Sequence, residues 1–413
     1  VVAIAKNQIK KKMESLEISV KFKEDTIILA GEDFTHKDLT EFEVENLIKN
    51  REPAELEVSF VADLSDQGKE KVLSGASACV QNPVDASIES YDPQSGKFTF
   101  TKEQVGVRVD TSKTLDNIRQ LLSQKHSGAL QAEFIEIKPE VLFADLDGKF
   151  TQISTFYTDS INTENGNHNM KLSMERVNGT ILNPGDIFSF NGIVGDSTTT
   201  DTGFLPAGGL SGGVSVQMVG GGICQSSTTI YGAAIRAGLE ITMRECHSLE
   251  SAYVPTGLDA TVDYGNIDFQ FRNNMKTPIY IATWMDGVRL HATIFGVQPE
   301  EWDRIEVSSE RTGSYNPLAD VQYVVDSTLS AGEYVLKTSG HYGYESIASR
   351  TYYKGDQVVK TEELPSSYYP PKGKVYTVGP NTDTSKIDTS KEAGSTVKQT
   401  PTPKPSESTP EKT

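Results

Sequence analysis

The chain is poor in the residues that mark several common classes of protein. Its three cysteines, Cys79, Cys224 and Cys246, are few and odd in number for 413 residues, which excludes the dense disulfide framework of small secreted domains. It contains no run of about eighteen apolar residues, so no segment is predicted to cross a bilayer. Asp and Glu (57) outnumber Lys and Arg (39), and the net charge of -18 argues against a nucleic-acid-binding surface.

A chain of 413 residues exceeds one compact core, which predicts two or three domains. It begins at Val1, with Lys6 and Lys10 to Lys12 close behind, a pattern that we interpret as the result of removing an upstream export signal or anchor. We therefore expect an extracellular protein, in the cell wall or anchored at the membrane surface. At most one disulfide can form, and Cys224 with Cys246 is the pair that we weigh against a free Cys224.

The first 150 residues show one α+β pattern twice, which predicts two units at about 1–52 and 53–150. Residues 17–34 alternate as a hairpin and 40–50 carry a helical apolar stripe. A second hairpin is predicted within 84–110, turning at 92–96, followed by a helix at 111–124 and a closing strand at 129–141. The segment 83–110 resembles the peptidoglycan-binding domain found beside L,D-transpeptidases, through Asp85-Ala86 and Gly106 to Asp110. That resemblance implies peptidoglycan as a partner, and a plain α+β spacer is the alternative.

Three consecutive glycines precede a lone cysteine in "GGGICQSSTT", residues 220–229. Glycine lets the backbone take positive φ and lets another group approach closely. The spacing of Ile230, Ala234 and Ala237 predicts a helix that ends at Gly238 and has Cys224 in its first turn. At that position the helix dipole and unpaired N–H groups lower the pKa of a thiol and favour the nucleophilic thiolate.

A histidine and an acid follow this cysteine in an order seen in papain-like and transglutaminase-like enzymes. His247 comes after a predicted strand at 240–246, and Asp259 begins another at 259–265. We hypothesise that Cys224 attacks an amide, that His247 moves its proton and that Asp259 orients the ring, with Asp263 or Asp268 as alternative acids. Backbone N–H groups and the amide of Gln225 would stabilise the oxyanion. The candidates for substrate binding are Gly220, Gly221, Gly222, Ser226 and Tyr253.

The alternative for these residues is structural: a packed thiol, a hydrogen-bonded histidine and a turn-capping aspartate. A zinc site of Cys224, Cys246 and His247 is disfavoured, because adjacent residues of a strand point in opposite directions. No metal and no other cofactor is expected. The Gly-, Ser- and Thr-rich segment 197–221 is predicted to be a flexible loop beside the site. At 277–296 we predict a β-hairpin that turns at Asp286-Gly287.

The central region resembles the VanW domain, a family named from vancomycin-resistance clusters of Gram-positive bacteria. The resemblance runs from about Ser154 to Gly296 and rests on "VNGTILNPGDIFSFNGIVG", "GGGICQSSTTIYGAAIRAGL", "HSLESAYVPTGLDATVDYG" and "DFQFRNNMKTPIYI", which occur in the family's order. The residue after the Cys-Gln pair, hydrophobic in the family, is Ser226 here, and Cys246 lies outside the pattern. The resemblance implies a mixed α/β domain at 151–300, with a papain- or transglutaminase-like fold as a hypothesis.

The remaining chain is predicted to be an extended β-module at 301–380 and a disordered Ser/Thr/Pro/Lys tail at 381–413. Gly332, Gly340, Gly343, Gly355 and Gly379 resemble the spaced glycines of the G-five domain, which implies binding of glycan containing N-acetylglucosamine. The tyrosines weighed for stacking on sugars, against packing within a thin sheet, are Tyr342, Tyr344, Tyr352 and Tyr353.

The sequence thus predicts an α+β multidomain protein of the cell envelope that binds peptidoglycan, with no nucleic-acid partner and with membrane contact only through a removed N-terminal anchor. Two functions stay open. In one, the chain is a cysteine-dependent hydrolase, amidase or transpeptidase that acts on stem-peptide amides. In the other, it is a non-catalytic wall-binding scaffold or adhesion module with a structural cysteine.

Overall fold

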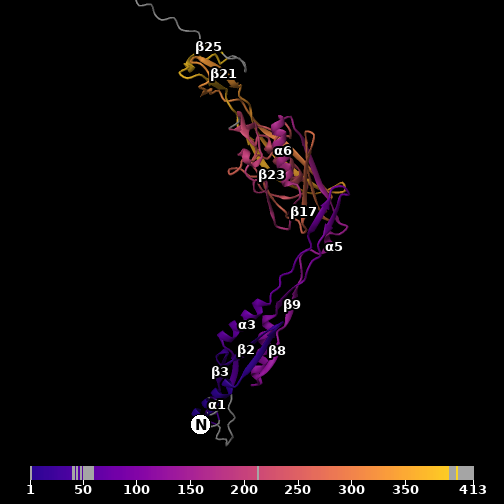
Figure 1. The fold of residues 1–413 in the computed structure, drawn as a ribbon, viewed down its shortest axis with the longest axis vertical. Coiled ribbons are helices and arrows are strands. Elements are labelled where there is room, and N and C mark those ends of the chain that lie inside the picture. Colours follow the sequence, from indigo (N-terminus) through magenta and orange to yellow (C-terminus); the bar gives the residue numbers. More distant parts are fainter. Residues whose placement is uncertain are drawn as a thin grey trace, which may run out of the picture. The chain divides into compact units, whose positions relative to one another are not determined.

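The computed structural model describes residues 2–39, 42, 45, 46, 49, 60–211, 214–389 and 397–398 (Figure 1). These residues form two compact units, 1–144 and 145–413. The first unit holds one core of apolar side chains, and the second holds two. Among the described residues, no helix is both long and apolar enough to cross a membrane.

The first unit is built on a small sheet of order β2-β1-β8, flanked by helices. Strand β1 (Glu17–Phe22) forms a hairpin with β2 (Asp25–Ala30) and pairs in parallel with β8 (Gly128–Gln131). Because side chains alternate along β1, Ile18, Val20 and Phe22 all point into the core. The other elements are α1 (Val2–Glu14), η1 (Gly31–Asp33), β3 (Phe34–Asp38), β4 (Phe60–Leu64), α3 (Asp66–Ala78), β5 (Ile88–Asp92), β6 (Lys97–Phe100), β7 (Gly106–Val109), α4 (Thr111–Ser123), β9 (Phe134–Ile137) and α5 (Phe143–Leu146), the last of which crosses into the second unit.

Both predicted hairpins of this unit, β1–β2 and β5–β6, and the helix α4 are confirmed. The predicted closing strand is two strands, β8 and β9, which pair with β1 and β7. The apolar stripe predicted at 40–50 falls mostly outside the described residues. Helix α3, which the sequence analysis did not predict, begins at Ser65, whose hydroxyl accepts a hydrogen bond from the Gly68 N–H as an N-cap does.

The second unit contains an antiparallel sheet of order β10-β18-β17-β11. Its strands are β10 (Phe150–Asp159), β11 (Thr180–Leu182), β17 (Ile279–Asp286) and β18 (Arg289–Val297). The hairpin predicted to turn at Asp286-Gly287 is confirmed as β17–β18. Helix α8 (Ile223–Arg236) packs on β10 and β18, and α6 (Glu164–Val177) packs on β17. The helix predicted after Gly222 is therefore confirmed, and it lies against the centre of the unit.

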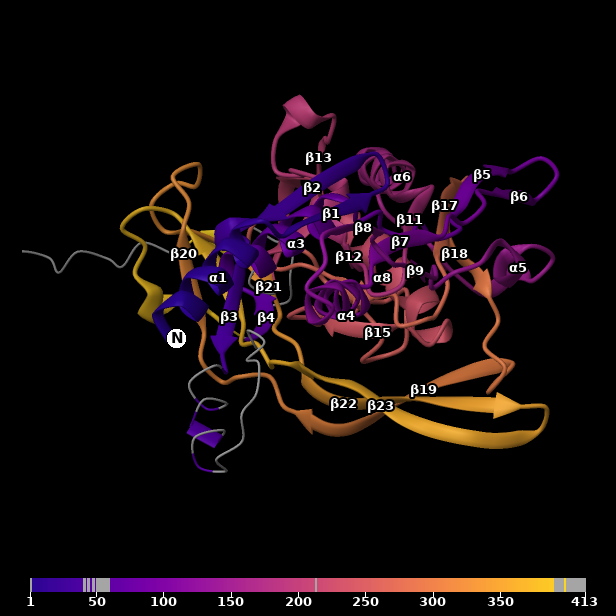
Figure 2. The same cartoon turned by 90° about the horizontal axis from the view of Figure 1, so that it is seen from below.

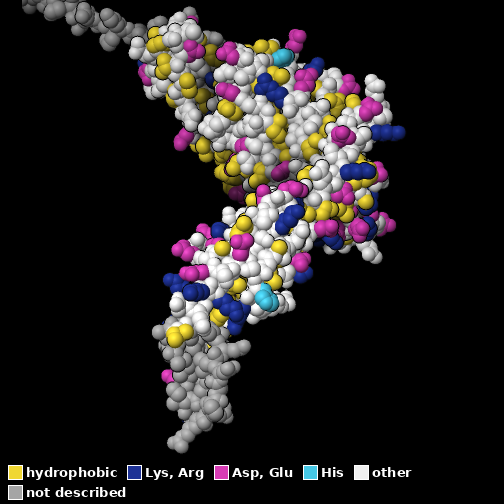
Figure 3. All heavy atoms as spheres, turned by 60° about the horizontal axis from the view of Figure 1, so that its bottom comes forward, with side chains coloured by type: hydrophobic (Ala, Val, Ile, Leu, Met, Phe, Trp, Pro, Cys, Tyr) yellow, Lys and Arg dark blue, Asp and Glu magenta, His cyan; other side chains and the backbone are white. Residues whose placement is uncertain are grey.

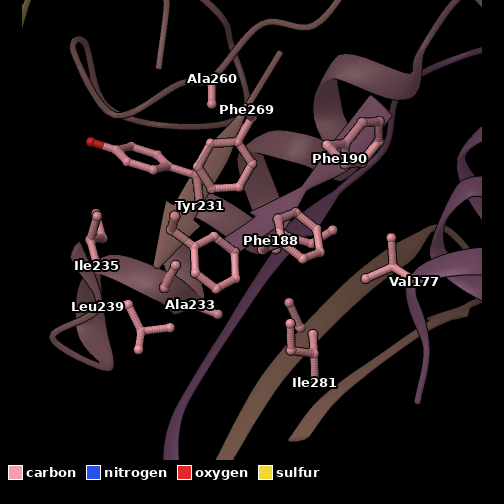
Figure 4. Close-up of a cluster of buried hydrophobic side chains, with 14 of the residues drawn as sticks. Val177, Phe188, Phe190, Tyr231, Ala233, Ile235, Leu239, Ala260, Phe269 and Ile281 are labelled. Carbon is pink, nitrogen blue, oxygen red and sulfur yellow. The ribbon is translucent and has the colours of Figure 1, made fainter. Parts of the chain in front are cut away.

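The main core of this unit lies between α8, α6 and the sheet strands. Phe188 stacks on Phe271 with ring centroids 4.6 Å apart, and Phe269 meets Tyr231 edge to face. Figure 4 shows Phe188, Phe269, Tyr231 and Ile281 converging in this cluster. A core of this density around α8 fixes the position of the helix that carries Cys224.

Gly232 on α8 shows how closely this helix packs. A Cβ atom at this position would lie 2.1 Å from the ring of Phe156 on β10. We expect Gly232→Ala to lower the free energy of unfolding by about 1–3 kcal/mol through overpacking, despite the better helix propensity of alanine. Denaturant unfolding measures this loss. Gly208→Ala is the matched control, because no heavy atom lies within 4 Å of its Cβ position, and an equal loss in both variants would contradict the packing account.

A smaller sheet of order β12-β16-β15 continues the domain. Its strands are β12 (Ile187–Ser189), β15 (Glu240–Met243) and β16 (Gln270–Arg272), and the short α7 (Phe190–Val194) follows β12. The segment 197–221 was predicted to be a flexible loop, and this prediction was wrong in large part. After the short η2 (Thr200–Thr202) it forms the antiparallel pair β13 (Pro206–Ser211) and β14 (Val214–Val219), whose backbone hydrogen bonds offset the high glycine content.

The C-terminal region is rich in strands, as predicted, and forms two sheets. The long sheet, of order β19-β22-β23, consists of β19 (Arg304–Tyr315), β22 (Gly343–Lys354) and β23 (Gln357–Tyr369) (Figure 2). The other contains β20 (Gln322–Val325), β21 (Glu333–Thr338), β24 (Val375–Val378) and the two-residue β25 (Val397–Lys398). Most of the predicted tail lies outside the described residues, but 381–389 are described and place η3 (Thr384–Lys386) and the buried Ile387 against the second sheet.

The long sheet packs directly on the central domain. Ala348 and Leu364 belong to the same core cluster as α8. The guanidinium of Arg350 on β22 donates to the Leu239 carbonyl, 2.8 Å away, just beyond the end of α8. A cation at that end of a helix stabilises its unpaired carbonyl groups. The long sheet and the central domain thus pack together as one body.

On the face shown in Figure 3, Lys and Arg side chains lie scattered among Asp and Glu. This distribution accords with the net charge of -18. Scattered cations lack the continuous positive potential that phosphate backbones select.

Candidate active site

The cysteine lies where the sequence predicted, in the first turn of α8. Gly222 is the N-cap of the helix at φ 101°, a conformation that favours glycine. A Cβ on Gly220 would lie 2.3 Å from the Ser197 carbonyl oxygen, and one on Gly221 would lie 2.4 Å from that of Ala207. The glycines were expected to leave room for substrate. In the structure, protein backbone fills the space beside Gly220 and Gly221. These two glycines therefore allow close packing of the backbone rather than leaving room for substrate.

The Cys224 sulfur is partly buried and lies among polar groups. It is 3.4 Å from the hydroxyl of Thr261 and 3.3 Å from the carbonyl oxygen of Val262, whose N–H points to the sulfur from 3.5 Å. His247 lies close enough to this sulfur to lower the pKa of the thiol through hydrogen bonding and charge. The sulfur therefore has donors that stabilise a thiolate.

His247 and Asp259 form a tight pair. The ring Nδ1 of His247 lies 2.5 Å from Asp259 Oδ2, and the His247 backbone N–H donates to the same oxygen over 2.8 Å. Both side chains are buried, with 7% of His247 and 1% of Asp259 exposed. His247 is thus hydrogen bonded to the carboxylate of Asp259 and lies beside the sulfur of Cys224.

The pKa values of the three groups shift together. Burial raises the pKa of the Cys224 thiol, but the hydrogen bond and charge of His247 outweigh it and hold the pKa below its ordinary value. Burial lowers the pKa of His247, but its bonds to Asp259 and Cys224 raise it to about 10. Burial likewise raises the pKa of Asp259, whereas His247 and Tyr369 lower it overall. These directions favour a thiolate–imidazolium pair beside an ionised carboxylate.

The other carboxylate oxygen of Asp259 has partners that the sequence analysis missed. Tyr369 donates to Asp259 Oδ1 over 2.5 Å, and Arg244 donates to it over 3.2 Å. The Arg244 side chain is 1% exposed and also donates to the Asp259 carbonyl and to Ser367. An arginine within the predicted strand at 240–246 was a weak signal for this role. Tyr369 gave no signal, because it lies 110 residues from Asp259, on β23.

The hydroxyl-rich start of α8 connects these parts. Ser227 donates to the Ala260 carbonyl over 2.6 Å, and Thr228 accepts from the Ala260 N–H over 3.0 Å. These bonds hold the residue after Asp259 against the helix that carries Cys224. The run of serines and threonines therefore sets the distance between the two segments of the site.

Tyr253, a predicted substrate-binding residue, lies near the sulfur. Burial, and then the negative charge of a Cys224 thiolate, raise the pKa of Tyr253. Ser251 is 3.2 Å from Nδ1 of His247. Tyr253 thus adjoins the candidate nucleophile as an uncharged phenol.

Two other predicted site residues face the interior. Ser226 has no exposed surface and accepts a hydrogen bond from Ser173 of α6 over 2.8 Å. The prediction that Ser226 binds substrate was therefore wrong, since its hydroxyl joins two helices. The Gln225 amide donates to Thr158 over 3.0 Å and only 5% of the residue is exposed, so it ties α8 to β10 rather than serving the expected oxyanion role.

The alternative acids and the other cysteine of this domain, Cys246, lie elsewhere. Asp268 accepts hydrogen bonds from Ser189 and the Asn191 N–H at the start of α7. Asp263 closes a short turn with Ile267. The Cys246 thiol donates to the Tyr368 carbonyl over 3.5 Å, while His247 faces Asp259, and all three cysteines are free.

A cavity of about 560 Å³ in this unit lies apart from the cysteine. It opens between the end of β15 and strands β22 and β23. Arg350 and Glu362, which pair at 2.8 Å, form part of its wall. Cys224, His247 and Asp259 do not line it, so the grouping of the three residues, and not this cavity, defines the candidate site.

The four tyrosines of the C-terminal module differ in exposure. Tyr352 is 2% exposed and packs edge to face on Trp302, so it serves the interior. Tyr344 is covered by the guanidinium of Arg311 and Tyr353 by that of Arg304. Tyr342 is 50% exposed. Of the four, Tyr342 presents the most open ring for stacking on a sugar.

Comparison with family models assigns three segments. Residues 11–131 match "Putative peptidoglycan binding domain", 165–295 match "VanW like protein" and 310–381 match "G5 domain". The last segment also resembles the solved "IgA1 Protease G5 domain structure", at 16% identity and a TM-score of 0.12, over 18% of this chain and 88% of that one. This set of domains is that of a cell-wall-associated protein.

Two curated relatives match about a third of the chain. One is "Uncharacterized protein YoaR" of Bacillus subtilis, 37% identical over 144 residues, which are 35% of this chain and 46% of that protein. The other is "Vancomycin B-type resistance protein VanW" of Enterococcus faecalis, 30% identical over 142 residues, which are 33% of this chain and 51% of that protein. The chain thus spans about half the length of the curated relatives it matches. The chain carries its peptidoglycan-binding, VanW and G5 segments in that order, and its central segment is similar to the VanW family over residues 165–295.

Proposed function

We propose that this protein is a cysteine-dependent enzyme that acts on peptide amide bonds of peptidoglycan. The observation that carries the proposal is the grouping of Cys224, His247 and Asp259, in which His247 is hydrogen bonded to Asp259 and lowers the pKa of the Cys224 thiol. The peptidoglycan-binding segment supports the choice of wall peptides as the substrate class. The papain- or transglutaminase-like fold suggested for the domain stays a prediction.

In the proposed reaction the Cys224 thiolate attacks the carbonyl carbon of an amide. The carbon–sulfur bond forms, and the oxygen takes up the negative charge. The imidazolium of His247 then gives its proton to the leaving nitrogen as the carbon–nitrogen bond breaks, which leaves a thioester on Cys224. Water completes a hydrolysis by attacking this thioester, and an amine completes a transfer.

The negative oxygen would be stabilised by the start of α8. The helix dipole is positive at this end, although the N–H groups of Ile223 and Gln225 already donate to the carbonyls of Gly220 and Gly222. Asp259 would keep the imidazolium in place without taking its proton, because His247 and Tyr369 hold the pKa of this carboxyl low.

The second candidate function is a wall-binding scaffold without catalysis. It is favoured by the roles found for Gly220, Gly221 and Ser226, which pack or bond within the protein. In this alternative the free Cys224 is a packed thiol, and the three domains bind wall polymers, with Tyr342 of the G5 segment open to a sugar ring.

Cys224→Ala separates the two functions. If the proposal is correct, wild-type protein incubated with purified peptidoglycan releases or rearranges peptide-containing fragments, and Cys224→Ala loses this activity by about a thousandfold or more. The products are measured by chromatography and mass spectrometry, and wall binding is measured by co-sedimentation. Cys79→Ala, in the first unit, is the control that should keep full activity. Equal product profiles for wild type and Cys224→Ala, with binding retained, would leave the scaffold.

A further inference from the structure

We infer that Tyr369, on β23 of the G5 segment, is a positioning residue for the candidate site of the VanW domain. This inference rests on the proposed function. It gives the C-terminal module a role in the chemistry, in addition to any role in binding wall polymers.

The Tyr369 hydroxyl has a fixed direction. It accepts a hydrogen bond from the Gly257 N–H over 2.9 Å, and its oxygen lies 2.5 Å from Asp259 Oδ1. Because the donor of Gly257 occupies one side of this oxygen, the phenol proton is directed to Asp259. Burial and the charge of Asp259 raise the pKa of Tyr369, so the hydroxyl keeps this proton over the pH range in which a thiolate would react.

The hydrogen bond from Tyr369 determines which groups bind each oxygen of the Asp259 carboxylate. Oδ1 accepts from Tyr369 and Arg244, and Oδ2 accepts from the backbone and ring of His247. Without the tyrosine hydroxyl, Arg244 would be the main partner of Oδ1 and would draw the carboxylate toward its guanidinium. Tyr369 therefore helps to keep Oδ2 on the imidazole that lies beside Cys224.

The strand that carries Tyr369 is itself tied to this place. Ser367, two residues before, accepts from Arg244 over 2.7 Å. A Cβ on Gly257 would lie 2.4 Å from the hydroxyl oxygen of Ser346 on β22, so the segment before Asp259 approaches the module as closely as glycine allows. The C-terminal module is thus packed against the acid of the site and not only attached by a linker.

Several ionisable groups other than Tyr369 face Asp259 and define its environment. They are Arg244, His247, Tyr231, Cys246 and Tyr253. Arg244 is the cation among these that is paired with Asp259 irrespective of the state of the histidine. A change confined to Tyr369 leaves all of them in place and tests the hydroxyl alone.

The test is Tyr369→Phe in the full chain, with Tyr352→Phe as the matched control. Tyr352 is equally buried in the same module and donates to the carboxylate of Glu362 over 2.8 Å, away from Asp259. The rate of Cys224 alkylation by iodoacetamide, resolved by peptide mass spectrometry, is measured from about pH 5 to 10. We expect Tyr369→Phe to slow alkylation near pH 6.5 by about tenfold and to move the profile to higher pH, while Tyr352→Phe follows the wild type.

The outcomes separate this inference from the proposed function. A wild-type profile at low pH that Tyr369→Phe leaves unchanged overturns the positioning role and leaves the enzyme proposal standing. A wild-type Cys224 that reacts only as an ordinary thiol, near pH 8.5 and above, overturns both. If the two tyrosine variants lower the unfolding temperature alike but only Tyr369→Phe moves the profile, the role is positioning rather than general stability.

Discussion

Replacing His247 by glutamine should remove most of the reactivity of Cys224 near neutral pH. Without the imidazolium, the hydrogen bond and charge that lower the pKa of the Cys224 thiol are lost, while the burial that raises it remains. The thiol would then be largely protonated, and alkylation by iodoacetamide at about pH 6.5 should fall at least tenfold. If the chain is an enzyme, its activity on wall peptides should fall by about 10²–10⁴-fold.

His291→Gln is the control for this result. His291 lies on β18, where its ring stacks on Trp284 with centroids 4.6 Å apart, and it takes no part in the site. Its replacement should leave both alkylation and activity near the wild-type values. Undiminished alkylation of His247→Gln at acidic pH would mean that the helix terminus alone activates Cys224, and the coupled pair would have to be abandoned.

Asp259→Asn should cause the largest loss of stability. The change removes the negative charge that faces Arg244, whose side chain is 1% exposed, and leaves this cation buried without its counterion. Breaking a buried ion pair from one side costs about 3–5 kcal/mol. Denaturant unfolding at neutral pH measures this loss in the free energy of unfolding. Asp268→Asn is the matched control, because Asp268 is a partly buried carboxylate that accepts from Ser189, Asn191 and Gln270, and a smaller loss is expected there.

The pH dependence of this loss gives a second measure. The folded-state pKa of Asp259 is lower than its ordinary value, so its charge contributes stability above about pH 4, and this stability disappears as the pH falls through the folded-state value. The difference between wild type and Asp259→Asn should therefore be full at neutral pH and shrink in strong acid. For His247 the sign is opposite: its raised pKa, about 10, adds stability that is lost as the pH rises from about 6.5 through that value. A stability difference that does not change with pH would contradict the ionised state of Asp259.

Local signals in the sequence predicted much of the fold. The Asp286-Gly287 turn predicted the β17–β18 hairpin, and the apolar spacing after Gly222 predicted α8. Both elements are specified by residues that are close together in the sequence, so turn chemistry and apolar periodicity are sufficient to predict them. The segment 197–221 was misjudged because its glycines suggested a loop, whereas strand pairing between β13 and β14 satisfies their backbone groups.

The candidate site was only half visible in the sequence. Cys224, His247 and Asp259 could be selected because their residue types and order match a known chemistry, and the structure brings them together. Tyr369 could not be selected, because nothing in a strand of a separate module indicates that its hydroxyl meets an acid 110 residues earlier. Ser226 was misassigned for a related reason, since the helix face that it occupies depends on the packing of α6.

The bond between Tyr369 and Asp259 also has a consequence for biosynthesis. A ribosome makes a protein from its N-terminus, so the peptide that contains Cys224, His247 and Asp259 emerges well before β23. Until residue 369 has been added, the acid lacks one of its donors and the partner strand is missing. If Tyr369 positions the acid as inferred, a partly translated chain would hold the nucleophile in an immature setting, and reactivity would mature only after β23 has been made.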